Sequence, residues 1–234
     1  MVRVKICGIT RREDAERALT YGADYLGFIF HPASPRAMTR KLVAAVVHAL
    51  RNTHPTAELF MRADPPRLVG VFVNERPNII AEILEECGLD LAQLSGDEVA
   101  SSVNTAESPI FGRAYKAIRP RTISEARSSA EQFSALVDDR DSHMPRLLLD
   151  TPHTSLFGGT GETSDWKLAA DLSAAMPGLM LAGGLRPETV ANAIRQVRPF
   201  AVDVASGVEA APGLKDPDRV REFILNARAV NDSR

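Results

Sequence analysis

Short apolar runs alternate with amphipathic stretches along the whole chain. An apolar run of about four to eight residues is typical of a strand buried on both faces, whereas apolar residues about three or four positions apart are typical of a helix. The predicted strands cover residues 2–7, 25–30, 68–74, 89–94, 112–118, 145–150, 178–184 and 200–206. The predicted helices cover 11–22, 40–50, 77–88, 123–137, 165–176, 186–197 and 216–231, and a short one begins within 96–103.

Each predicted strand is followed by a predicted helix, giving eight strand–helix pairs and no signal of an antiparallel hairpin. Repeated units of this kind predict a parallel sheet, in which helices form the crossover connections. Eight units in 234 residues favour an α/β fold of a single (β/α)8 TIM barrel that forms one domain over residues 1–234. A doubly wound open sheet is the alternative, but the glycine-rich phosphate loop expected near its start is missing.

Residues 51–67 interrupt the alternation with a polar, proline-bearing stretch between a helix and a strand. A segment in this place lies at the N-terminal end of the strands, the face of a barrel that usually serves stability. We therefore interpret it as a loop extension away from the chemistry.

Composition and charge exclude some classes of function. The chain has 28 basic and 30 acidic residues and no block of like charge, so nothing points to nucleic acid or an anionic membrane as a partner. Its apolar runs are far shorter than the roughly 20 residues of a spanning helix, and none near the N-terminus resembles a signal peptide. Two cysteines are too few for a disulfide framework, which favours a cytoplasmic location.

Residues able to carry chemistry gather where the predicted strands end. They are Cys7, Arg36, Asp150, the glycines of 158–161, Gly183, Gly184, Asp203 and residues 206–209. The carboxyl ends of barrel strands form the active face of such folds, so we expect these residues to surround one cavity.

Glycines after the last two predicted strands predict a phosphate site. Residues 182–185 read AGGL and residues 205–209 read ASGVE, in the loops that commonly hold phosphate in these barrels. Glycine lets backbone N–H groups close on an anion, and a helix N-terminus adds its positive end. Two tight turns without a ligand are the alternative.

Asp150 and Cys7 are candidates for proton transfer. Asp150 ends an apolar strand, where partial desolvation raises the pKa of a carboxyl group toward the range of a general acid. A helix cap or a salt bridge, for example with Arg146, fits equally well. Cys7 could act as a base if the site lowers its thiol pKa modestly from about 8.5. Its alternative is a small buried hydrophobe, which is how we interpret Cys87.

Arg36 and Asp203 are candidates for substrate binding. Arg36 could fork onto a carboxylate, or be a solvated loop charge. Asp203 lies between two valines, so its side chain points the opposite way and could accept hydrogen bonds from sugar hydroxyls or pair with a cation inside the barrel. The five histidines show no metal-ligand spacing. This layout suits a sugar phosphate with an anionic far end, isomerised by an acid and a base without a metal.

Seven motifs, in order, resemble those of the phosphoribosylanthranilate isomerase family across nearly the whole chain. They are KICGIT (5–10), SPR (34–36), QLSGDE (93–98), LLLD (147–150), GGTGETSDW (158–166), LAGGLRPETV (181–190) and VDVASGVEAAPGLKD (202–216). The resemblance implies a cofactor-free (β/α)8 enzyme of tryptophan biosynthesis that isomerises N-(5′-phosphoribosyl)anthranilate by an Amadori rearrangement.

By motif match, the resemblance also implies residue roles. Asp150 would be the general acid that opens the ribose ring, and Cys7 the general base that takes the C2′ proton. Arg36 would hold the anthranilate carboxylate, and Asp203 the ribose hydroxyls. The phosphate would lie on backbone groups of Gly159, Gly183, Gly184, Ser206 and Gly207. The implied partner is a small-molecule sugar phosphate, with the chain a monomer or homodimer.

The chain departs from the family pattern at Ser95, where histidine is usual, at Thr189, where asparagine is usual, and in the length of 51–67. None of these touches the implied acid–base pair. Three alternatives stay open: another metal-independent sugar-phosphate isomerase or epimerase on the same barrel, a bifunctional isomerase, and a non-catalytic barrel that binds a phosphorylated ligand. The bifunctional enzyme would need a second acid in place of Cys7, and the intact Cys7 and Asp150 argue against a non-catalytic barrel.

Overall fold

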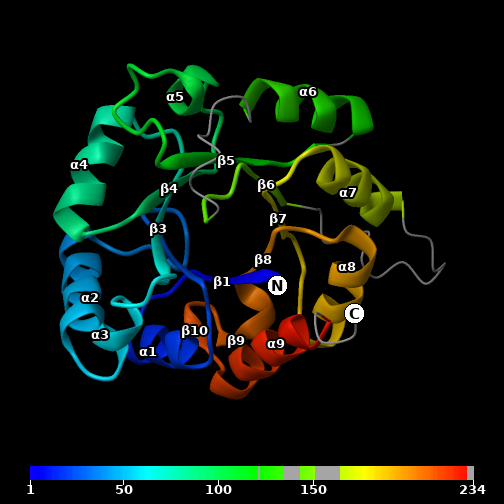
Figure 1. Cartoon of the computed structure of the whole chain (residues 1–234). Helices are drawn as coiled ribbons and strands as arrows, with labels where there is room; N and C mark the ends of the chain where they lie inside the picture. Colours follow the sequence, from blue (N-terminus) through cyan, green and yellow to red (C-terminus); the bar gives the residue numbers. More distant parts are fainter. Residues whose placement is uncertain (121, 134–142, 151–163, 231–234) are drawn as a thin grey trace.

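Eight parallel strands close into a barrel in sequence order (Figure 1). The structure, a computed structural model, describes residues 1–120, 122–133, 143–150 and 164–230. The strands are β1 Arg3–Cys7, β2 Tyr25–Ile29, β3 Arg67–Phe72, β4 Leu91–Leu94, β5 Ala114–Ile118, β6 Leu147–Asp150, β7 Leu179–Ala182 and β8 Ala201–Val204. Because β8 pairs with β1, the sheet has no open edge, and the predicted (β/α)8 barrel is confirmed over the open sheet.

Helices form a ring outside the strands (Figure 1). They are α1 Arg12–Thr20, α2 Arg40–Asn52, α3 Thr56–Leu59, α4 Pro77–Cys87, α5 Ser101–Asn104, α6 Ile123–Phe133, α7 Ser164–Ala175, α8 Pro187–Val197 and α9 Pro217–Ala229. Proline at the first turn of α4, α8 and α9 starts each helix, because the missing N–H has no helical partner there. None of the helices in the described part of the chain has the length and apolar character needed to cross a bilayer.

Strand β4 begins two residues later than its apolar pattern predicts. Gly88 adopts a left-handed conformation after α4, with φ of 66°. The N–H of Leu89 then reaches back to the carbonyl of Leu84 at 2.8 Å. Because the first apolar residues of the run form this helix-ending turn, the backbone pairing of β4 with its neighbouring strands starts only at Leu91.

The structure contains one antiparallel hairpin for which no signal was found in the sequence. Strands β9 Glu209–Ala211 and β10 Leu214–Lys215 pair antiparallel in the loop between β8 and α9. The dipeptide of Pro212 and Gly213 joins them, and Gly213 has φ of 81°. Proline followed by glycine is a turn signal that the apolar pattern alone does not register.

Residues 51–67, predicted as a loop extension, contain the end of α2, the short α3 and the entry to β3. Thr56 begins α3 and donates its hydroxyl to the carbonyl of Leu50 at 2.8 Å. Asp64 accepts from Arg3 at 3.2 Å, at the start of β1. This segment therefore lies at the N-terminal end of the strands, away from the carboxyl ends.

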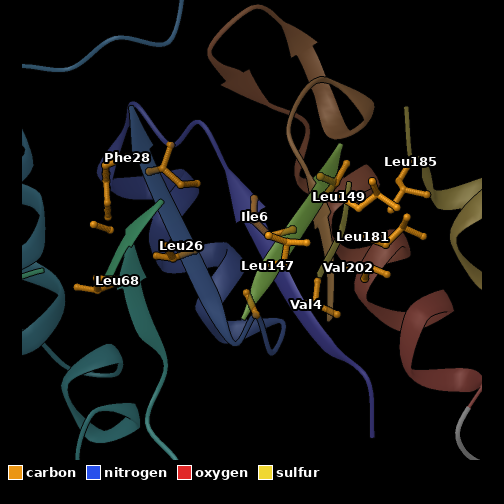
Figure 2. Close-up of a cluster of buried hydrophobic side chains, with 14 of the residues drawn as sticks. Val4, Ile6, Leu26, Phe28, Leu68, Leu147, Leu149, Leu181, Leu185 and Val202 are labelled. Carbon is orange, nitrogen blue, oxygen red and sulfur yellow. The ribbon is translucent and has the colours of Figure 1, made fainter. Parts of the chain in front are cut away.

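Side chains alternate between the two faces of the barrel wall. Outward-facing residues such as Val4, Ile6, Leu26 and Phe28 join the large apolar cluster between strands and helices (Figure 2). A second apolar cluster fills the barrel interior; it includes Tyr25, Val69, Leu91, Tyr115, Leu148, Met180 and Ala201. The same alternation turns Lys5 and Cys7 inward on β1, so the residues that face the interior are fixed by the pleat.

The outward cluster carries most of the packing, which a matched pair of leucines can test. Leu26 has no exposed surface, whereas Leu225 on α9 is 55% exposed. We expect Leu26→Ala to reduce the free energy of unfolding by about 2–5 kcal/mol, because it leaves a cavity in a close-packed region. Leu225→Ala should change it by no more than about 0.5 kcal/mol. Urea unfolding followed by circular dichroism measures both, and equal losses would contradict this assignment of the core.

Candidate active site

The carboxyl ends of the strands surround a cavity of about 350 Å³. Eight residues predicted from the sequence line it: Cys7, Arg36, Asp150, Gly183, Gly184, Asp203, Ser206 and Gly207. Gly159, the remaining predicted residue, lies outside the described residues. The fold therefore gathers side chains from β1, β6, β8 and the loop after β2 around one space, together with the glycine loops after β7 and β8.

Cys7 is buried at the cavity floor beside a glycine that makes room for its sulfur. Cys7 pairs with Gly27 of β2 in the ladder. A Cβ atom on Gly27 would lie 2.7 Å from the Cys7 Sγ, closer than real side chains approach. Sequence reasoning missed this requirement, although a glycine in the middle of the apolar run 26–30 was its signal.

The condition under which Cys7 would most readily act as a base, a thiol pKa lowered by the site, is not met in the structure. Burial raises the pKa of the thiol above its ordinary value, since a thiolate loses its hydration there. The neighbouring Lys5 ammonium acts in the opposite direction and is the strongest favourable influence on the thiolate. Burial and the Asp203 carboxylate therefore disfavour the thiolate, whereas the Lys5 and Lys215 ammonium groups favour it.

Lys5 is the centre of a polar network inside the barrel. Its side chain is fully buried and donates to Gln93 Oε1 at 2.9 Å and Asp203 Oδ1 at 3.0 Å. The Tyr115 hydroxyl donates to the same Gln93 oxygen at 3.1 Å. Burial acts to lower the pKa of Lys5, but Asp203, Cys7 and Tyr115 together raise it, so Lys5 carries its charge.

Sequence reasoning did not select Lys5 or Gln93. The signal for Lys5 was its place in a strand that alternates apolar and basic residues, two residues before Cys7 and therefore on the same face. The alternative proposed for Asp203, a buried acid paired inside the barrel, is what the structure shows. The same carboxylate also lines the cavity, so pairing with Lys5 leaves it at the site.

Asp150 stands at the end of β6 and forms an ion pair with Arg119. The Arg119 Nε donates to Asp150 Oδ2 at 2.7 Å, and the Asp150 side chain is 28% exposed. Arg119 follows β5 and lines the same cavity. A salt bridge was one sequence-based alternative for Asp150, but Arg119 takes the place suggested for Arg146. In barrel order, β7 and β8 separate Asp150 on β6 from Cys7 on β1.

The glycine loops after β7 and β8 lie against each other. Gly183 and Gly184 have φ values of 98° and 61°, which other residues rarely adopt. A Cβ on Gly207 would lie 1.9 Å from the carbonyl oxygen of Leu185, so no other residue fits there. Arg219 of α9 holds this turn by donating to the Gly207 carbonyl from Nε at 3.1 Å and from Nη2 at 3.0 Å. Two tight, mutually packed backbone turns therefore border the cavity.

Arg36 is paired rather than a solvated loop charge. Its Nε and Nη2 atoms donate to the two carboxylate oxygens of Glu209 at 2.7 and 2.6 Å. Lys215 Nζ donates to Glu209 Oε1 at 2.9 Å. No local pattern indicates this contact, because Arg36 and Glu209 are 173 positions apart.

Two departures from the family pattern have clear structural roles. Thr189 caps the first turn of α8, where its hydroxyl accepts from the backbone N–H of Arg186 at 3.1 Å. Ser95 lines the cavity and accepts from Gln93 Nε2 at 3.1 Å, which extends the network around Lys5 toward the rim. Among the residues that the structure describes, no three His, Cys, Asp or Glu side chains form a group suited to a metal ion.

Comparisons with known proteins show the family to which this chain belongs. The family described as N-(5′-phosphoribosyl)anthranilate (PRA) isomerase matches residues 4–226. A protein of that name from Trichlorobacter lovleyi is 42% identical over 230 residues, covering 97% of this chain and 98% of its own. A crystal structure of monomers of a dimeric isomerase of this kind from Thermotoga maritima superposes with a TM-score of 0.76 at 35% identity, covering 98% of this chain and all of that one.

A further crystal structure holds an isomerase of this kind in complex with reduced 1-(o-carboxyphenylamino)-1-deoxyribulose 5-phosphate. It is similar to this chain at 34% identity, with a TM-score of 0.74, and it covers 98% of this chain and 100% of its own. A ligand that joins a sugar phosphate to a carboxylated ring is therefore known for a relative.

The pKa of Cys7 can be measured by alkylation. In a Cys87→Ser variant only Cys7 remains, and we expect its rate of reaction with iodoacetamide to rise with pH to a midpoint above the about 8.5 of a free thiol. The reason is that burial raises its pKa, so less thiolate is present at any given pH. The same protein unfolded in urea is the control. A midpoint in the folded protein below that in urea would overturn this description.

Proposed function

The chain belongs to the N-(5′-phosphoribosyl)anthranilate isomerase family, and on this premise we propose which of its residues perform the reaction. The protein is an isomerase of tryptophan biosynthesis that converts N-(5′-phosphoribosyl)anthranilate to 1-(2-carboxyphenylamino)-1-deoxy-D-ribulose 5-phosphate. We assign Asp150 as the general acid and Cys7 as the general base. The observation that carries this assignment is the single cavity that both side chains line, bordered by the two glycine turns.

Asp150 acts first in this scheme. Its protonated carboxyl group gives a proton to the ribose ring oxygen, the bond from that oxygen to C1′ breaks, and the nitrogen lone pair forms the C1′=N bond of a Schiff base. The position of Asp150 at the end of β6 supports this role, because the side chain is partly exposed to the cavity and not sealed in the barrel. The hydrogen bond that Arg119 Nε donates to Oδ2 orients the carboxyl group at the rim and leaves Oδ1 to carry the proton that is transferred.

Cys7 completes the rearrangement. Its thiolate takes the proton from C2′, and the electrons of that bond form the C1′=C2′ double bond while the nitrogen becomes neutral. The resulting enolamine tautomerises to the ketone: C1′ gains a proton from water and the C2′ hydroxyl loses its proton to water. The Cys7 thiol and the Asp150 carboxylate then return to their starting states by exchanging a proton through solvent. The Lys5 ammonium supports this role because it favours the thiolate inside a cavity that otherwise disfavours charge.

We propose that the phosphate, the ribose and the anthranilate of the substrate bind in turn along the barrel rim, from the loop after β7 to the loop after β2. We place the phosphate at the backbone of Gly183, Gly184, Ser206 and Gly207, and also at Gly159, which lies outside the described residues. Asp203 binds the ribose hydroxyls, supported by its place between the glycine turns and Cys7. Arg36, on the far side of Cys7, binds the anthranilate carboxylate, supported by its position on the cavity wall.

Location and assembly are part of this proposal. Cys7 and Cys87 are both free thiols in the fold, which supports a reducing cytoplasm. The partner is a small sugar phosphate. For the assembly we propose a monomer or a homodimer; a dimeric isomerase from Thermotoga maritima is similar to this chain.

The acid–base assignment is tested by loss of fluorescence of the substrate, generated in place from anthranilate and phosphoribosyl pyrophosphate with the preceding transferase. We expect Cys7→Ser and Asp150→Asn each to reduce kcat/KM by about 100-fold or more, as removal of a general acid or base does. Cys87→Ser, which alters a thiol remote from the cavity, is the matched control and should retain activity.

Two results would count against the proposal. Near-parental activity of either folded variant would remove that residue from its catalytic role. Absence of turnover by the folded parent protein would contradict the activity itself and direct attention to other sugar phosphates.

A further inference from the structure

The guanidinium group of Arg36 forms hydrogen bonds along one of its edges only. Nε and Nη2 form one edge of the planar fork, and both donate to Glu209. An arginine has five N–H donors in fixed directions, so this pairing leaves the edge formed by Nη1 and the second Nη2 hydrogen. Within the described part of the chain no acceptor lies on Nη1, and Arg36 lines the cavity.

Glu209 begins β9, and other residues of the same β9–β10 hairpin donate hydrogen bonds to its carboxylate. Lys215 of β10 donates its ammonium to Glu209 Oε1 at 2.9 Å and to the carbonyl of Ala205 at 3.0 Å. The backbone N–H of Gly213 at the hairpin turn donates to the same Glu209 oxygen at 3.3 Å. The side chains of Glu209 and Lys215 are 5% and 1% exposed, so neither is free to leave this arrangement.

The stem of Arg36 is fixed from the opposite side by Gly8. A Cβ at Gly8 would lie 2.5 Å from the Arg36 Cδ, so the arginine stem lies directly on this backbone. Gly8 follows Cys7, which places the arginine next to the proposed base. Backbone at one end and a carboxylate at the other leave Arg36 little rotational freedom.

The charges of this cluster leave an excess of positive charge. Although burial acts to raise it, the pKa of Glu209 is held below its ordinary value by the hydrogen bonds from Arg36 and Lys215. Burial lowers the pKa of Lys215, an effect that its hydrogen bond with Glu209 opposes, and one carboxylate thus faces two cations. An Arg–Glu pair alone would be neutral, whereas the third group, Lys215, keeps the cluster attractive to a further anion.

We propose that Glu209, supported by Lys215, is a positioning residue that aims the remaining edge of Arg36 at the aromatic carboxylate of the substrate and so selects a carboxylated arylamine. This inference rests on the proposed role of Arg36 and extends it to two residues outside the loop of Arg36. A pre-oriented fork binds a planar carboxylate through two parallel hydrogen bonds, and it loses less side-chain entropy than a mobile arginine would.

A different role for Glu209 makes the opposite prediction. If Glu209 only occupied the place of the substrate carboxylate, the substrate would have to displace it, and its removal would lower KM. If Glu209 only supported the adjacent turn Ser206–Val208, its removal would weaken phosphate binding for every substrate. The three roles are therefore separable by which part of the substrate is affected.

The experiment compares two substrates on Glu209→Gln and Lys215→Met. One substrate is N-(5′-phosphoribosyl)anthranilate, and the other is N-(5′-phosphoribosyl)aniline, made by condensing aniline with ribose 5-phosphate and followed by chromatography. We expect each variant to raise KM for the carboxylated substrate by about 10-fold or more, the scale of a lost hydrogen bond to a charged group. For the aniline substrate KM should stay within about twofold, and kcat within about threefold for both, since the aimed edge of Arg36 contacts only the carboxylate.

Three controls keep the outcome specific. Glu222→Gln removes the same charge from an exposed position on α9 and should change neither KM. The inhibition constant of inorganic phosphate should be unchanged in Glu209→Gln, and thermal unfolding should show a folded protein. If Glu209→Gln is unfolded, Lys215→Met decides the matter by the same comparison.

Arg36→Met separates this inference from the proposed function. If Arg36→Met raises KM selectively for the carboxylated substrate and Glu209→Gln does not, the positioning role is wrong and the role of Arg36 stands. If Arg36→Met has no selective effect, the proposed function of Arg36 is itself wrong. A lowered KM in Glu209→Gln, or equal losses on both substrates with weaker phosphate inhibition, would also overturn the positioning role.

Discussion

The pairing of β8 with β1 is the constraint on which the rest of this molecule depends. Once the sheet closes, the pleat decides which side chain of every strand faces the interior, and the register decides which of them are neighbours. Lys5 is paired in register with Asp203, and Cys7 with Gly27. A shift of one residue would turn Lys5 toward the apolar cluster outside the barrel and Val4 toward the cavity. The same register therefore determines both the site and the packing of the core.

Burying an ammonium group inside the barrel costs folding free energy unless neighbouring groups accept its hydrogen bonds and balance its charge. Removing one partner of a buried ion pair typically costs about 3–5 kcal/mol, because the other charge is left uncompensated. Here Asp203 and Gln93 accept from Lys5, and Tyr115 donates to Gln93. Apolar residues would pack this space more simply. The charged arrangement places a cation next to the cysteine sulfur and an acid at the cavity wall, which an apolar interior cannot provide.

The rim of the barrel is built by a different principle. The side chains proposed to act there are held by partners from other segments, as Asp150 is by Arg119 and Arg36 is by Glu209. Glycines at positions 183, 184 and 207 bring the backbone itself to the cavity. The strands supply stability and direction, while the loops carry most of the groups proposed for recognition, as is usual in this fold.

The sequence by itself determined the eight barrel strands, the helices that follow them, the closed barrel and the residues that gather at the carboxyl ends of its strands. These follow from local patterns: apolar periodicity, proline and glycine at helix ends, and polar residues at strand ends. It could not determine the partners. Lys5 and Asp203 are 198 positions apart and Arg36 and Glu209 are 173 apart, so no local pattern records either contact.

The direction of the Cys7 pKa was decided in the same way, by tertiary structure. The pKa of a thiol at a strand end can be lowered by a cation or raised by burial, and the net direction depends on which residues surround the thiol. The hairpin β9–β10 was missed because its strands are too short to show a period, and only its contacts with Arg36 give it a role. Local periodicity fixes what each segment becomes, whereas burial and charge arise only where distant segments meet.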